Sequence, residues 1–136
     1  MTTVHAFDDE LARLDAMATA EAIRQGSLTI TEVVDAAIER SRRVDSATNA
    51  VVTPDYERAK ATAGSSPITS PADASPFVGV PTFIKDMTAV AGLPTRNGSN
   101  AIASAPAAKV TFGIAQQLFD LGAIGLLLAV GLRHDW

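Results

Sequence analysis

Lys85 is the residue whose type and position best suit chemistry in this sequence. It follows the apolar stretch Phe77 to Ile84, which we expect to form a buried strand, and it precedes a loop. Ligand sites of layered α/β proteins collect where strands end. Shielding by Phe83 and Ile84 would favour the neutral amine, which accepts a proton. A solvated lysine at a strand end is the alternative that spacing alone leaves open. Asp86 would point to the opposite face.

Few serines in this sequence are placed where they could act as a nucleophile. Ser65 and Ser66 form the only Ser-Ser pair, but they precede Lys85 in a stretch rich in Gly, Ser and Pro. Ser99 follows Asn97-Gly98 and is better explained as a turn residue. The chain has no Gly-x-Ser-x-Gly element of the kind that presents a nucleophile at a sharp strand-to-helix turn.

The remaining polar groups fit structural roles better than catalytic ones. The two histidines are isolated, and a metal site would need converging ligands that the acidic run near the amino terminus lacks. The arginine run suits a charge pattern late in a helix better than a phosphate clamp. We therefore expect no metal and no cofactor. These groups are His5, His134, Asp8-Asp9-Glu10, Arg40, Arg42 and Arg43.

Two helices are expected before Lys85 in the first third of the chain. Apolar residues recur at helical spacing from Leu11 to Ile23, and Gly26 is placed to end that helix. Thr29 and Glu32 have the spacing of a capping box, in which each side chain accepts the other residue's backbone N–H. The second helix should then run from about Ile30 to Val44, with its cations late.

Helices and strands alternate along the rest of the chain, which predicts an α/β layered fold with a mixed sheet. Thr53-Pro54 should supply an N-cap and a proline at the first helical position. The last helix should bury a stripe of Val110, Ile114, Leu118 and Leu121 and stop at Gly122. The expected elements are a strand at 49–53, a helix through Ala63, a loop at 64–76, a strand at 77–84, a loop at 92–104, a helix at 107–121 and a strand at 123–126.

Composition narrows the class of protein. Apolar residues make up 47% of the 136 residues and charged residues 19%, which is typical of a globular domain. The net charge of −4 gives no basic surface for nucleic acid. Cysteine is absent, the amino terminus does not resemble a secretory signal, and the apolar run 123–132 is too short to span a bilayer. We therefore expect a cytoplasmic protein with no membrane partner.

The segment around Lys85 resembles the lysine-bearing segment of the amidase-signature family. The resemblance rests on Gly79-Val80-Pro81-Thr82-Phe83-Ile84-Lys85-Asp86 and on the loop Thr95-Arg96-Asn97-Gly98-Ser99, which is similar to the family's Thr-x-x-Gly-Ser element. Downstream, Val110 to Ile124 resembles the segment that leads into the family's Gly-Ala-x-x-x-Gly-Lys-Thr-Asn run. Upstream, Thr31-Glu32-Val33 and Asn49-Ala50-Val51-Val52 stand in the family's order. The likeness covers roughly residues 14–126.

The resemblance implies hydrolysis of linear amides by a Ser–cis-Ser–Lys triad. In that mechanism a neutral lysine, here Lys85, takes the proton of a bridging serine, which activates a nucleophilic serine. An acyl-enzyme forms and is hydrolysed. The fold implied is the α/β/α layered fold of the family, and the partner implied for the full-length enzyme is a small-molecule amide.

The sequence departs from the family pattern after Leu126. Residues 127–136 read Leu-Leu-Ala-Val-Gly-Leu-Arg-His-Asp-Trp, where the family continues toward Gly-Lys-Thr-Asn. We therefore expect 1–126 to be the N-terminal part of an amidase domain and 127–136 an aberrant tail. Both triad serines would then be missing, and the isolated chain would be inactive. The alternative is a non-catalytic binding or interaction piece, with self-association through unpaired strand edges.

Overall fold

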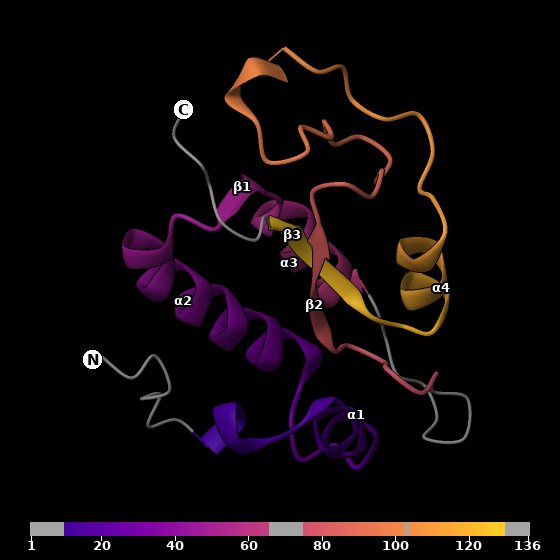
Figure 1. Ribbon diagram of the computed structural model, residues 1–136. Coiled ribbons are helices and arrows are strands. Elements are labelled where there is room, and N and C mark those ends of the chain that lie inside the picture. Colours follow the sequence, from indigo (N-terminus) through magenta and orange to yellow (C-terminus); the bar gives the residue numbers. More distant parts are fainter. Residues whose placement is uncertain (1–9, 66–74, 103, 130–136) are drawn as a thin grey trace.

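The computed structural model describes residues 10–65, 75–102 and 104–129. Helices and strands alternate along the chain, as expected for an α/β fold (Figure 1). The elements are η1 (Glu10–Arg13), α1 (Ala16–Arg24), α2 (Ile30–Thr48), β1 (Val51–Pro54), α3 (Tyr56–Ser65), β2 (Pro81–Lys85), η3 (Asn100–Ile102), α4 (Ile114–Asp120) and β3 (Ile124–Ala129).

The first two helices begin and end at local signals. Asp15 caps α1 by accepting the N–H of Ala18 at 2.8 Å, and Gly26 follows the helix with a φ of +72°. The capping box of α2 is confirmed, because Thr29 Oγ1 accepts the Glu32 N–H at 3.1 Å and Glu32 Oε2 accepts the Thr29 N–H at 2.8 Å. The helix continues to Thr48, four residues beyond the expected end.

The junction between β1 and α3 differs from the expectation. Pro54 is the last residue of β1, and α3 begins at Tyr56. The Asp55 N–H donates to Leu126 O at 3.0 Å, which holds the backbone against the sheet, and Asp55 O accepts the Ala59 N–H at 3.1 Å. The prediction that Thr53-Pro54 opens the helix is therefore wrong, because the sheet holds the chain two residues further.

The described sheet is mixed and has the strand order β1-β3-β2. β1 pairs antiparallel with β3, and β2 pairs parallel with it. β2 is shorter than the expected strand 77–84, because residues 76–79 form a turn and Gly79 adopts a φ of +70°. A Cβ at Gly79 would come within 2.8 Å of Ile30 Cγ1, so a close approach to α2 also requires glycine. β3 is longer than expected and central.

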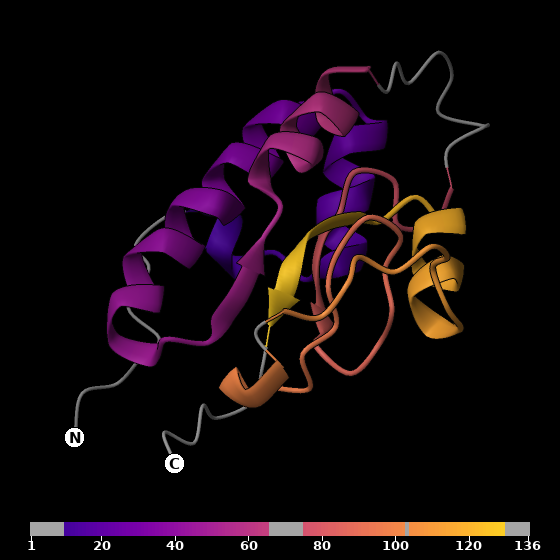
Figure 2. The ribbon, with the colours of Figure 1, turned by 90° about the horizontal axis from the view of Figure 1, so that it is seen from above.

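Helices lie on both sides of the sheet (Figure 2). On one side α1, α2 and α3 pack with Ile124 and Leu126 of β3 in the larger apolar cluster. On the other side Ala115 of α4 packs with Ile84 and Val90 in a smaller cluster. Ile124 and Leu126 therefore connect β3 to the larger cluster, and both side chains are buried beneath the helical layer.

The expected helix 107–121 is wrong in its first half. Ala108 exchanges backbone hydrogen bonds of 2.9 Å with Gly92 and Leu93, and the Phe112 N–H donates to Ala89 O at 3.0 Å. These pairings with the loop 89–94 occupy groups that a helix would need, so only 114–120 is helical.

The stripe that was expected to be buried by that helix is mostly exposed. The exposed fractions are 65% for Val110, 60% for Ile114 and 39% for Leu121, whereas Leu118 is partly buried. Ala115, which the stripe did not include, is fully buried. The short helix therefore faces the sheet through a different set of positions.

Candidate functional site

Lys85 is the last residue of β2 and pairs with Ala129 of β3. Its side chain is exposed, as is that of Phe83 on the same face of the strand. Ile84 points to the opposite face and is only 5% exposed. The expectation that Phe83 and Ile84 shield the lysine is therefore wrong for the described part of the chain, since one neighbour is exposed and the other is turned away.

The backbone turns immediately after Lys85. Its carbonyl oxygen accepts the N–H groups of Met87 at 2.8 Å and Thr88 at 2.9 Å. Within residues 10–65, 75–102 and 104–129, no hydrogen bond or ion pair involves the ammonium group. The position of Lys85 is therefore set through its backbone, and its amine is available to a reacting group.

Asp86 is the residue of this site that sequence reasoning set aside. Its side chain is 2% exposed, and its carboxylate accepts the Arg96 N–H at 2.9 Å and the Gly98 N–H at 3.0 Å. The backbone oxygen of Asp86 accepts the Asn97 N–H at 2.9 Å. The loop 95–99 is thus wrapped around the residue that follows Lys85.

Two signals in the sequence point to this role of Asp86. Aspartate accepts backbone N–H bonds at turns, and Asn97-Gly98 marks a turn ten or so residues downstream. Spacing alone does not predict that Asp86 pairs with this turn, because the pairing depends on how the intervening loop folds. The opposite-face argument for Asp86 is consistent with the structure, since Lys85 is exposed and Asp86 is buried.

Two buried polar atoms beside this loop have no hydrogen-bond partner among the described residues. They are Thr95 Oγ1 and Arg96 Nε, from the first two residues of the loop. Buried polar atoms are usually paired, so these two atoms are available to accept or donate a bond. The end of β2 therefore combines an exposed amine with unpaired polar atoms in the neighbouring loop.

The serines have structural contacts. Ser99 Oγ accepts the Ala101 N–H at 3.2 Å, and the Ser99 N–H donates to Arg96 O at 3.0 Å, as a turn residue would. Ser65 Oγ donates to Thr62 O at 3.2 Å near the end of α3. Ser66 lies outside the described residues, so its pairing with Ser65 has no structural account. No described serine hydroxyl is bonded to Lys85.

Two arginines of α2 make side-chain contacts, one with α3 and one within α2 itself. Arg42 lies over the ring of Tyr56, with 5.0 Å from its guanidinium carbon to the ring centre, and Arg43 pairs with Glu39 at 3.6 Å. They lie in the body of the helix rather than near its end, because α2 continues to Thr48. The expected dipole role of these late cations is therefore wrong, and the last turn carries no basic residue.

The other polar candidates fall partly outside the described chain. His5, His134, Asp8 and Asp9 are not among the described residues, and Glu10 begins η1. Over the described ranges, no three His, Cys, Asp or Glu side chains come together in a way that could hold a metal ion. The helices of those ranges are all too short or too polar to cross a membrane.

A cavity of about 390 Å³ lies between α3, β3 and α4. Phe119 is part of its lining, together with Asp55 and Arg58, which form an ion pair. Arg58 Nη1 also donates to Ala91 O at 2.8 Å, which ties α3 to the loop that follows β2. Lys85 does not line this cavity, so the cavity and the lysine are separate features.

Known proteins are similar to this chain in sequence and in fold. A family model described as Amidase matches residues 32–127. A putative amidase, AmiC, of Mycobacterium leprae is 44% identical over 102 residues, which cover 74% of this chain and 20% of the relative. The 6-aminohexanoate-cyclic-dimer hydrolase of Paenarthrobacter ureafaciens is 37% identical over 76 residues, or 56% of this chain and 14% of the relative.

Solved structures extend the likeness to the fold. A 6-aminohexanoate cyclic dimer hydrolase complexed with substrate superposes with a TM-score of 0.77 at 25% identity, over 92% of this chain and 25% of that one. A bacterial aryl acylamidase of the amidase-signature family superposes with a TM-score of 0.73 at 23% identity, over 85% and 25%. The expected α/β fold is thereby confirmed.

The extent of these matches matters for what the chain can do. The chain spans about a fifth of the length of the curated amidases that it matches. The family model covers well over half of the chain itself, including Lys85, Asp86 and the loop 95–99. The chain therefore belongs to the amidase family.

Proposed function

We propose that this chain is the lysine-bearing part of an amidase that hydrolyses carbon–nitrogen bonds of linear amides. Lys85 is the general base: its amine accepts the proton of a bridging serine, which activates a second serine to attack the amide carbonyl. The acyl-enzyme is then hydrolysed by water. The observation that carries the proposal is an exposed lysine at the end of β2 that has no partner among the described residues and lies within the range matched by the family model.

The 136-residue chain by itself is proposed to be inactive. Only Ser99 and Ser104 follow Lys85, and the hydroxyl of Ser99 accepts a backbone N–H in its turn. A base without an adjacent hydroxyl cannot generate the nucleophile. The proposed boundary between an amidase part at 1–126 and a different tail at 127–136 stays a prediction, and β3 extends across it to Ala129.

A chimera tests the role of Lys85. Residues 32–127 would replace the matching segment of the 6-aminohexanoate-cyclic-dimer hydrolase, and turnover of its cyclic dimer would be measured. The unmodified chimera should be active, and Lys85→Ala should lower its kcat by about 10²- to 10⁴-fold, as expected for loss of a general base. Lys109→Ala serves as the control and should leave kcat unchanged.

The outcomes separate the parts of the proposal. A folded chimera without turnover, or a Lys85→Ala chimera with full turnover, would contradict the assignment of Lys85. Turnover of simple aliphatic or aryl amides by the 136-residue chain, lost in Lys85→Ala, would contradict its proposed inactivity.

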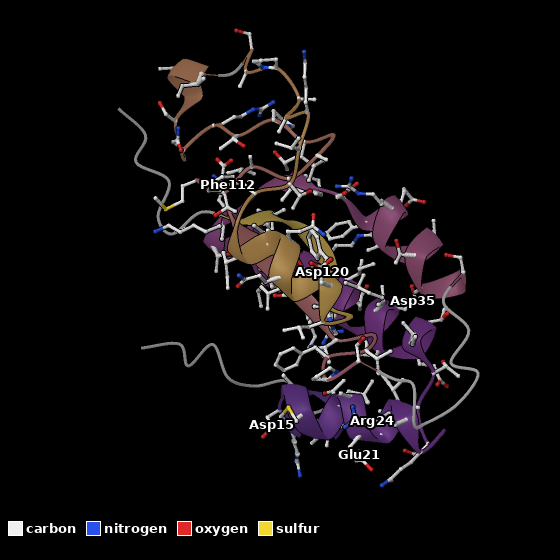
Figure 3. All side chains as sticks on the ribbon, turned by 90° about the vertical axis from the view of Figure 1, so that its right-hand side faces the viewer. Asp15, Glu21, Arg24, Asp35, Phe112 and Asp120 are labelled. Atoms are coloured by element: carbon white, nitrogen blue, oxygen red, sulfur yellow. The ribbon has the colours of Figure 1, made fainter. Side chains whose placement is uncertain are left out.

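A role as an interaction piece is the second candidate, and exposed apolar side chains favour it. Val110, Phe112 and Ile114 are 65%, 71% and 60% exposed, and Figure 3 labels Phe112 beside α4. Contiguous exposed apolar surface is typical of interaction sites. The proposed self-association would therefore use this segment rather than β3, which is central in the sheet.

Sedimentation velocity across a range of protein concentrations tests this second role. The wild type should associate, and Phe112→Ser should remain monomeric at the same concentration. Met17→Ser provides the control, because Met17 is also exposed, at 54%, but lies on α1. A monomeric wild type, or equal association of both variants, would exclude the segment as the interface.

A further inference from the structure

We infer that Asp86 is a positioning residue for Lys85: its buried carboxylate holds the loop 95–99 against the end of β2. The importance of this role for catalysis rests on the proposed function of Lys85. The contact itself does not, because it is a property of the folded chain.

Three consecutive backbone N–H groups converge on Asp86. Those of Arg96 and Gly98 donate to the two carboxylate oxygens, at 2.9 and 3.0 Å, and that of Asn97 between them donates to the backbone oxygen of Asp86 at 2.9 Å. Hydrogen bonds to an ionised acceptor are stronger than neutral ones. The side chain and the main chain of one residue therefore anchor the same loop.

The loop adopts a conformation that depends on this anchor. Asn97 has a φ of +52° and Gly98 a φ of +70°, two successive residues in the left-handed region. This region is unfavourable for residues other than glycine, although asparagine tolerates it better than most. The bonds to Asp86 compensate for that cost, so loss of the carboxylate should release the loop.

Because the Asp86 carboxylate is buried, it requires specific hydrogen-bond partners. Asp86 is 2% exposed, and a buried carboxylate is unfavourable unless hydrogen bonds replace its water. Asparagine at this position would retain one carbonyl acceptor and turn an amide N–H₂ toward the second backbone donor. One of the two N–H groups would then be left unpaired in a partly buried place, which costs more than the simple loss of a bond.

The anchor acts on Lys85 through the backbone. The lysine side chain has no bond within the described residues, so nothing but the main chain fixes its direction there. On one side Lys85 is held by pairing with Ala129, and on the other by the turn to Met87 and by Asp86. Loosening Asp86 therefore allows the end of β2 to fray and the lysine to move.

Nuclear magnetic resonance of the full 136-residue chain tests this inference directly. The chain has three lysines, Lys60, Lys85 and Lys109, so ¹³C-dimethylation gives few lysine signals, and Lys85→Arg assigns the relevant one. Asp86→Asn should shift the Lys85 signal and leave the other two in place. The amides of Arg96 and Gly98 should exchange with solvent about 10- to 100-fold faster.

Asp45→Asn is the matched control. Asp45 Oδ1 accepts the Val51 N–H at 2.9 Å, so this variant also removes an aspartate that accepts a backbone N–H, at the junction of α2 and β1. Asparagine keeps the one acceptor that the Val51 N–H needs, so this variant removes an aspartate charge without unpairing a backbone donor, and it should leave the Lys85 signal in place. Asp86→Ala, if it folds, should produce the larger effect on both readouts, and Asp86→Asn is the variant on which the result depends.

Specific outcomes would overturn the inference. It fails if the Lys85 signal of Asp86→Asn stays at the wild-type position, or if Asp45→Asn moves that signal equally. It also fails if the Arg96 and Gly98 amides exchange equally fast in wild type and Asp86→Asn. None of these readouts measures amide hydrolysis, so their failure leaves the chimera test intact, and failure of the chimera leaves them intact.

Discussion

The two sides of β3 are packed very differently. On the side of α1, α2 and α3, the larger cluster includes Val34 at 0% and Ile38 at 2% exposure. On the side of α4, the smaller cluster buries Ala115, while Ile114 at the start of the same helix is 60% exposed. Figure 1 shows α1 and α2 on one side of the strands and the short helix α4 on the other.

This contrast teaches where the chain specifies its own structure. Each helix in the larger cluster carries apolar residues at helical spacing, so burial and local preference act together. The stripe Val110, Ile114, Leu118 and Leu121 has similar spacing, yet the segment 107–113 is not helical because its backbone pairs with the loop 89–94. An apolar helical pattern is therefore a reliable guide only where no neighbouring backbone competes for the hydrogen bonds.

The largest expected effect compares two isoleucines. Ile38→Ala removes a side chain that is 2% exposed and should lower the free energy of unfolding by ~2–5 kcal/mol through lost burial and a cavity. Ile114→Ala makes the same chemical change at 60% exposure and should alter it by less than about 0.5 kcal/mol. Urea titration measures both. Equal losses would show that the two sides of β3 are equally packed.

A glycine at the junction of α4 and β3 sharpens the comparison. Gly122 has a φ of +91°, and a Cβ there would lie 2.9 Å from the Val78 Cα. Gly122→Ala should therefore lower the free energy of unfolding by ~1–3 kcal/mol. Gly64 in α3 has nothing within 4 Å of an added Cβ, and Gly64→Ala should stabilise by up to ~1 kcal/mol. Thermal melting that gives both variants the same sign would contradict the assigned geometry.

The capping box provides a smaller effect within α2. Thr29→Ala removes the hydroxyl that accepts the Glu32 N–H and should lower the free energy of unfolding by ~0.5–2 kcal/mol. Thr29→Ser retains the acceptor and should remain close to wild type in the same urea titration. A serine variant as unstable as the alanine variant would mean that the hydroxyl is not what the helix requires.

The smallest effect is a pH dependence. Hydrogen bonds from the backbone N–H and then the hydroxyl of Thr29 lower the pKa of Glu32 below its usual 4.5. A depressed pKa contributes stability that is present above the usual value and lost as the pH falls through the folded value. Glu32→Gln should therefore flatten the decline of stability below about pH 4.5. The free energy of unfolding of both proteins would be measured from pH 6 to pH 3. If it declined equally in wild type and Glu32→Gln, the proposed contribution of Glu32 would be contradicted.

Much of the candidate site could be predicted because it depends on short-range patterns. Lys85 was expected at the end of a strand, and it is there, since an apolar β-branched run followed by turn residues marks both features. Its exposure was not predicted, because shielding depends on which neighbours share its face and on what covers that face. The role of Asp86 was missed for a similar reason: its partners lie ten and twelve residues downstream.

Sequence patterns alone predict α2, the end of α1 before Gly26, the α/β class and the family that the segment around Lys85 resembles. These follow from caps that act over three residues and from motifs that are contiguous in the chain. Three features require the folded structure: 107–113 is not helical, β3 is central in the described sheet, and Asp86 anchors the loop 95–99. Each of these depends on backbone groups that meet only after the chain has folded, so local preference does not reveal them.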